Sequence, residues 1–300
     1  MAIQKLEIQI LVENVSGPPG TLGEGGFSAL VIAHSKSEKY KILFDSGPSA
    51  VSILNNIKKL QVDLTTINAI VLSHGHWDHV GGLNEIIPLI NKRVPLICHP
   101  QALSPKWFID KGESIDVGIQ GFINSPEELN EQTKLMMTTS PYKFTESIMT
   151  TGEVPRINNF ELLSGKLEEV KTLIDGKEVP DQLPDDLSLI FHLVDGSVVI
   201  LTGCCHSGII NTIAKTKTLM KSSKIRGIIG GLHLHDASIK RLNETIRELK
   251  KYPIKELAPC HCTGLKGKVG LFNAFNKEFI DTTVASVITI EAIDDVLQSD

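Results

Sequence analysis

The residues best suited to chemistry lie in one short run, Ser73-His74-Gly75-His76-Trp77-Asp78-His79, which follows an apolar stretch. Four of the seven can bind a cation through imidazole nitrogen or carboxylate oxygen, ligands that suit Zn²⁺, Fe²⁺ or Mn²⁺. In an extended loop His74 and His76 point the same way, so one cation can take both imidazoles. Asp78 and His79 can then turn toward a second cation. A solvated turn with capping residues is the alternative, but it does not explain four ligand-type residues in six positions. We therefore predict a metal site.

Other histidines and cysteines follow apolar stretches further along the chain. His206 lies in a Cys-His-Ser-Gly turn after 200–202, and we expect a metal ligand there in preference to a helix cap. His233 follows 227–232 and could be a ligand, a proton donor or a substrate contact. His261 lies between Cys260 and Cys262, where the alternative to a ligand role is a separate structural zinc site formed with the cysteines. Structural or surface roles are expected for the remaining histidines that we weighed, His34, His99, His192 and His235.

Strands and helices must alternate to position these residues. Apolar runs predict strands at 5–12, 27–34 and 40–45. Asp195-Gly196 between two apolar runs indicates a hairpin, and the spacing over 239–250 predicts a helix.

A weak internal repeat relates two strand-helix-strand stretches, 42–76 and 200–235. The strands of such a unit are parallel, so the loops that follow them emerge at one sheet edge. Either the similarity arose by chance between two such units, or two related halves direct their loops at one site.

Residues 101–160 fit the strand-helix rhythm poorly and contain four prolines, Pro105, Pro126, Pro141 and Pro155. We interpret this stretch as an insertion, helical in part, that covers the site within a single domain spanning 1–300. Arg156 near its end would be available to an anionic group of the substrate.

Composition excludes several classes of protein. The chain has 300 residues, a formal charge of −5, and 41% hydrophobic and 22% charged residues, which excludes a disordered, collagen-like or disulfide-stapled chain. Mild acidity argues against nucleic-acid and membrane partners, and we expect a small-molecule substrate. The oligomeric state stays open. No apolar run approaches the roughly 18 residues of a membrane helix, and the cysteines fit reduced thiols, so we expect a cytoplasmic protein.

The run His74-x-His76-x-Asp78-His79 resembles the HxHxDH signature of the metallo-β-lactamase superfamily. Ile42 to Gly47 is similar to that superfamily's early strand, which ends in an Asp-Thr/Ser-Gly turn. The resemblance implies an α/β fold, a four-layer αββα sandwich of two mixed sheets. It also implies that Asp45 orients the ligand loop from behind, and that His261 is the last histidine ligand.

Four further segments resemble the subgroup that contains an archaeal synthase of methanopterin biosynthesis. The sequence departs from most superfamily hydrolases at Thr202-Gly203-Cys204, where they have Thr-Gly-Asp with a metal-bridging Asp. Cys204 therefore either touches metal or supports the ligands from behind, and we assign it the second role. The usual third histidine motif is also missing near Asp185-Asp186, so His206 would supply that ligand. The four segments of the resemblance are 151–156, 202–209, 230–234 and 259–264.

The resemblance implies a metal-dependent hydrolase acting on a small, anionic substrate, with Asp78 and His233 as catalytic residues. One or two divalent cations are expected, Zn²⁺ first, with Fe, Mn or Mg as alternatives. The alternative functions are a transferase that couples a dihydropterin to ribofuranosylaminobenzene 5′-phosphate, and a metal-binding protein without catalysis. The expected metal ligands are His74, His76, Asp78, His79, His206 and His261.

Overall fold

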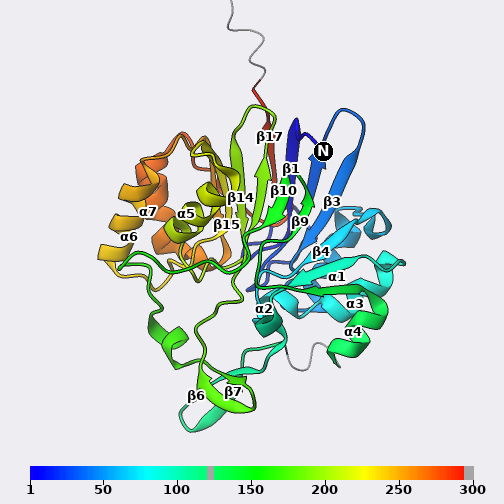
Figure 1. The fold of residues 1–300 in the computed structure, drawn as a ribbon, viewed down its shortest axis with the longest axis vertical. Coiled ribbons are helices and arrows are strands. Elements are labelled where there is room, and N and C mark those ends of the chain that lie inside the picture. The colour runs from blue at the N-terminus through cyan, green and yellow to red at the C-terminus, as the bar shows by residue number, and fades with distance from the viewer. Residues whose placement is uncertain (120–124, 294–300) are drawn as a thin grey trace, which may run out of the picture.

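Two β-sheets face each other in the computed structural model, which describes residues 1–119 and 125–293 (Figure 1). In the first sheet the strand order is β17-β1-β2-β3-β4-β5-β8, and in the second it is β16-β15-β14-β13-β10-β9. The strands of the first sheet are β1 Lys5–Val12, β2 Ser28–His34, β3 Lys39–Phe44, β4 Ala69–Val71, β5 Pro95–Cys98, β8 Lys134–Met137 and β17 Val287–Glu291. Those of the second are β9 Lys143–Thr145, β10 Ile148–Thr150, β13 Leu189–His192, β14 Val198–Thr202, β15 Ile225–Gly231 and β16 Glu256–Cys260.

Helices cover the outer face of each sheet, as Figure 1 shows. None of the helices within the described residues is both long enough and apolar enough to cross a membrane. On the side of the first sheet lie α1 Ala50–Lys59, α3 Leu83–Ile90 and α4 Pro126–Gln132, and the short α2 Trp77–Val80 begins inside the histidine-rich run. On the side of the second sheet lie α5 Ile209–Met220, α6 Ile239–Leu249 and α7 Gly264–Phe275.

Apolar side chains fill three layers of core. Phe27, just before β2, and Phe44 of β3 share a buried cluster with Phe191 of β13. The Phe27 and Phe44 rings lie edge to face, with their centroids 6.4 Å apart. A second cluster joins the first sheet to α1 and α3, and a third joins the second sheet to α5, α6 and α7. The predicted four-layer αββα sandwich is therefore confirmed.

The local predictions about secondary structure also agree with the structure. The strand expected at 5–12 is β1, and the helix expected at 239–250 is α6, whose first turn is capped by Ser238 Oγ accepting from Arg241 N. Strands β13 and β14 pair antiparallel around Asp195-Gly196. Gly196 has φ 75°, a left-handed conformation that costs glycine little.

The two halves of the sequence repeat become two parallel strand-helix-strand units. Strand β3 pairs in parallel with β4 across α1, and β14 pairs in parallel with β15 across α5. Strand β16 continues the second unit in parallel with β15. The loops after all five strands therefore emerge at the edge where the two sheets meet.

A third, smaller sheet lies apart from the sandwich, at the bottom of the view in Figure 1. Two of its strands lie within 106–116, inside the predicted insertion at 101–160, and its other two strands lie beyond residue 160. The rest of that stretch is less separate than expected, since β8 joins the first sheet and β9 and β10 join the second. Residues 120–124 lie outside the described residues. The strands of the small sheet are β6 Lys106–Asp110, β7 Glu113–Asp116, β11 Lys171–Ile174 and β12 Lys177–Pro180.

Candidate metal centre

Sharp turns at the strand ends bring the candidate residues together. Asp45, Cys205, His233 and His261 follow β3, β14, β15 and β16, and each has a left-handed backbone with φ between 45° and 59°. A non-glycine residue in this region costs roughly 1–2 kcal/mol. The turns bring four separate loops to one place.

One donor group consists of imidazoles. His74 Nε2 lies 3.1 Å from His76 Nδ1 and 3.3 Å from His206 Nε2. All three side chains are buried. Burial lowers the pKa of His74 and of His206 well below the usual value, and it lowers the pKa of His76 to about 4. At neutral pH these are neutral imidazoles, the form that binds a cation.

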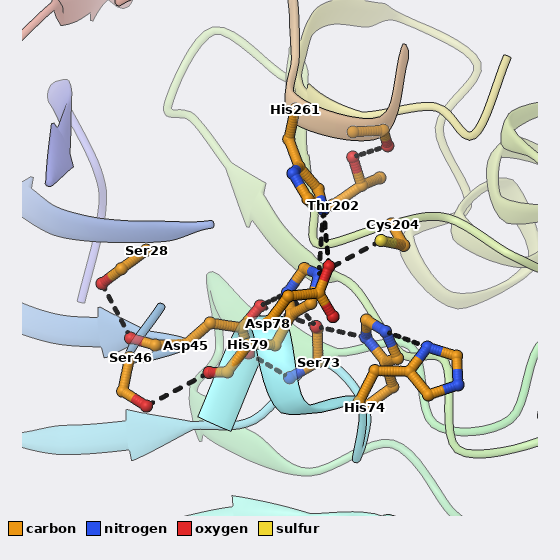
Figure 2. Close-up of polar contacts among 12 residues, drawn as sticks. Ser28, Asp45, Ser46, Ser73, His74, Asp78, His79, Thr202, Cys204 and His261 are labelled. Carbon is orange, nitrogen blue, oxygen red and sulfur yellow. Dashed lines mark hydrogen bonds and ion pairs between the residues drawn. The ribbon is translucent and has the colours of Figure 1, made fainter. Parts of the chain in front are cut away.

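The second donor group mixes nitrogen, oxygen and sulfur (Figure 2). His79 Nε2 lies 3.1 Å from Cys204 Sγ and 3.3 Å from His261 Nε2. Asp78 Oδ2 lies 3.3 Å from the same His261 nitrogen. These four residues lie close enough to hold one cation, and Cys204 Sγ also lies close to the donor atoms of His74 and His206.

Three of the ligand-type histidines, His74, His79 and His261, are oriented through the other ring nitrogen. The Nδ1 of His79 lies 2.7 Å from Asp45 Oδ2, and the Nδ1 of His261 lies 2.9 Å from Asn14 Oδ1. His74 Nδ1 lies 2.9 Å from Ser73 Oγ, which donates to Asp45. Such contacts fix the tautomer so that Nε2 carries the lone pair. Figure 2 shows Asp45 beside His79.

The arrangement fits a divalent cation. Because Asp45 and Asn14 accept hydrogen bonds from His79 and His261, the two Nε2 lone pairs face each other at 3.3 Å. Burial lowers the pKa of His79, but the charges of Asp78 and Asp45 outweigh it and raise this pKa to about 9. The site therefore favours added positive charge, and a metal ion can take the place of that proton.

Cys204 lies among the donor atoms rather than behind them. The chain reaches this position because Gly203 has no side chain: a Cβ there would lie 2.1 Å from Ser73 Oγ and 3.0 Å from Asp45 Oδ2. Burial raises the pKa of the Cys204 thiol well above its usual value when no metal is present. A bound cation would favour the thiolate.

Carboxylates occupy the region where the third histidine motif is missing, and they hold the backbone of the ligand loops. Asp185 Oδ2 accepts from Gly75 N at 2.9 Å, and Asp186 Oδ2 accepts from Ser207 N at 2.9 Å. Asp185 also forms an ion pair with Lys106, a fully buried residue of the small sheet. Sequence reasoning missed both Lys106 and Asn14, since each meets its partners only through the tertiary fold.

Arg156 and His233 lie beside the first donor group. Arg156 donates from Nη1 to the carbonyl of Gln182 at 2.8 Å and from Nη2 to the carbonyl of His206 at 3.3 Å. The guanidinium therefore supports the loop that carries His206, and its role toward a substrate stays a prediction. The His233 ring lies 4.5 Å from the His206 ring, centroid to centroid. His99, by contrast, lies outside the centre and pairs with Glu153 at 2.9 Å.

A cavity of about 140 Å³ adjoins the centre on the side of the small sheet. Trp77 and Phe108 supply aromatic surface, and Lys166 Nζ lies 4.8 Å from the centre of the Phe108 ring. The cavity thus combines flat apolar walls with one cation. Its lining residues are His76, Trp77, Asp78, Phe108, Val117, Lys166, Leu167 and Val170.

Residues 22–261 match the model of the metallo-β-lactamase superfamily. An uncharacterised protein of Methanocaldococcus jannaschii is 34% identical, over 94% of this chain and all of that protein. The 7,8-dihydropterin-6-methyl-4-(β-D-ribofuranosyl)-aminobenzene-5′-phosphate synthase of the same organism is 28% identical, over 92% of this chain and 94% of the synthase. A solved structure of a metal-dependent hydrolase of the β-lactamase superfamily superimposes with a TM-score of 0.77 at 22% identity, covering 95% of this chain and 99% of that one.

Proposed function

This chain belongs to the metallo-β-lactamase superfamily, and on that premise we propose that it is a metal-dependent hydrolase of a small, anionic substrate. One observation carries the proposal: two metal-capable donor groups converge on Cys204 Sγ, and the cavity opens beside His76 and Asp78. A centre of this kind next to a cavity can act on a molecule held there.

The donor atoms suit one or two divalent cations. Imidazole, carboxylate and thiolate together favour Zn²⁺, while Fe or Mn would suit the nitrogen and oxygen donors and Mg would suit the oxygen alone. When bound, such cations lower the pKa of water from 15.7 to about 7 and stabilise charge on a leaving oxygen. In this proposal His74, His76 and His206 hold one cation, and Asp78, His79, Cys204 and His261 hold the other.

The protein's own groups would bind and orient the substrate. Trp77 and Phe108 offer stacking surface for a flat ring, and Lys166 offers charge to an anionic group. His233 has a ring nitrogen free to hold or release a proton beside the first donor group, which supports its proposed catalytic role.

A second candidate is the transferase that couples a dihydropterin to ribofuranosylaminobenzene 5′-phosphate. In that reaction an amine attacks the pterin methylene carbon, a C–N bond forms, the C–O bond to pyrophosphate breaks, and the amine loses a proton. Two observations favour it: Cys204 stands where most superfamily hydrolases have a bridging Asp, and the similarity to the synthase covers 92% of the chain. With a thiol in place of that carboxylate, the residues present would offer a weaker hold on the water that a hydrolase must activate.

Turnover assays on the zinc-loaded protein test both candidates. A phosphodiester, a lactone and a thioester are offered beside the pterin coupling reaction, and we expect hydrolysis. Asp78→Ala should abolish it in a folded protein, whereas Asp281→Ala, at an exposed carboxylate, should leave it unchanged. Coupling without hydrolysis would select the transferase. If neither activity is detected, the function that remains is a metal-binding protein without catalysis.

A further inference from the structure

Cys262 and His233 form a third group of donor atoms with Cys204, beside the two groups already described. One ligand atom from each of the three residues lies within 4.8 Å of the others. We propose that this group is a further, thiolate-rich cation site that takes Zn²⁺, with Cys204 Sγ shared between it and the second donor group. The inference concerns metal binding alone and does not depend on which reaction the protein catalyses.

The imidazole of His233 is the first observation. The residue is only 7% exposed, and neither ring nitrogen has a hydrogen-bond partner among the residues that the structure describes. A buried polar group without a partner costs roughly 1–3 kcal/mol. Its left-handed backbone, φ 45°, adds further cost, so the fold holds this ring in place against two penalties. A cation bound to the ring would offset both.

The placement of Cys262 is the second observation. The backbone N–H groups of Leu234 and His235 both donate to its carbonyl at 3.2 Å, which fixes the turn after β15 against the turn after β16. Gly231 makes room for the thiol, since a Cβ there would lie 2.6 Å from Cys262 Sγ. Cys262 is half-buried whereas the other four cysteines are buried, so an ion can reach this group from solvent.

The chemistry of the donors is the third observation. Two sulfurs and one nitrogen form a softer set than either neighbouring group, and Cys₂His is a ligand set that zinc uses with a fourth position open.

Metal titration of the full-length protein tests the proposal. Metal-free protein, kept reduced, is titrated with Co²⁺ while the thiolate-to-cobalt charge-transfer band is recorded. The wild type should bind about three equivalents. Cys262→Ser and His233→Ala should each bind about one fewer, and Cys262→Ser should lose about two thirds of the band, because two of the three thiolate–cobalt bonds disappear with the third cation. Cys98→Ser, at a buried thiol outside the centre, is the matched control and should match the wild type.

A second measurement needs no variant and so does not depend on how a variant folds. Wild-type protein with increasing Zn²⁺ is treated with iodoacetamide, and labelling of Cys262 is followed by mass spectrometry. The proposal expects protection of Cys262 to develop with the third equivalent. Full labelling at saturating Zn²⁺, or a wild-type stoichiometry of two that Cys262→Ser leaves unchanged, would overturn it.

Discussion

Replacing Lys106 by Met tests how the small sheet is joined to the metal centre. Lys106 begins β6 and is fully buried, with Nζ 2.5 Å from Asp181 and 3.3 Å from Asp185, both of which are also buried. Asp185 in turn accepts from Gly75 N, between two of the proposed ligands. Met has nearly the same length as Lys and fills the same space, so the change removes the charge and little packing.

The expected loss is large because two carboxylates would be left without their cation. Breaking a buried ion pair by removing one partner costs about 3–5 kcal/mol of unfolding free energy. Lys171→Met is the matched control, since Lys171 lies in the same sheet but its pair with Glu178 is about half exposed. That change should cost at most about 0.5 kcal/mol.

Two pKa shifts determine how the difference in unfolding free energy between wild type and Lys106→Met depends on pH. Burial alone would lower the pKa of Lys106, but the charges of Asp185 and Asp181 outweigh burial and raise this pKa. The stabilisation that Lys106 contributes is therefore complete below about pH 10.4 and is lost as pH rises through the pKa of the folded state. Burial alone would raise the pKa of Asp185, but the charge of Lys106 outweighs burial and lowers this pKa. The stabilisation that Asp185 contributes is therefore present above about pH 3.9 and is lost as pH falls through the pKa of the folded state. The difference between wild type and Lys106→Met should be widest between these limits.

Urea unfolding followed by circular dichroism, at several pH values and with metal removed, measures the loss. Zinc affinity is measured on the same samples, and it should fall in Lys106→Met because the loop around Gly75 loses its support. A loss below about 1 kcal/mol, or one equal to that of Lys171→Met, would refute the reasoning. Adding Asp181→Asn to Lys106→Met should recover part of the stability, because one uncompensated charge is then removed.

His206→Ala should lower the metal stoichiometry of the purified protein because it removes one of about three ligands, while His192→Ala should not; full occupancy in His206→Ala would exclude His206 as a ligand. Asp45→Asn should lower zinc affinity by roughly 10–100-fold, measured by competition with a chelator, since the carboxylate fixes His79; an unchanged affinity would contradict that role. Arg156→Ala should raise KM for a phosphate-bearing substrate by a larger factor than that by which it lowers the bound-metal content. A fall in metal content alone would show that Arg156 serves only the carbonyl of His206.

The sequence is most informative where a feature is local. The strand at 5–12, the hairpin at Asp195-Gly196 and the histidine-rich run all follow from neighbouring residues, and the repeat places the loops at one edge. By contrast, β8 has no alternating burial that a pattern could reveal, so its place in the first sheet was not anticipated. Only the docking of β6 creates the ion cluster around Lys106, whose partners lie 75 and 79 residues away.

The left-handed turns at the strand ends also bear on how the protein can evolve. At Asp45, His233 and His261 a glycine would relieve backbone strain but would remove a side chain from the centre. Cys205 has the same kind of backbone, φ 59°, but its thiol hydrogen-bonds to Thr212 within a buried apolar cluster and belongs to none of the donor groups found among the described residues. Under selection for heat resistance alone, all four positions should drift toward glycine or asparagine. Where metal binding is also selected, only position 205 should be free to do so.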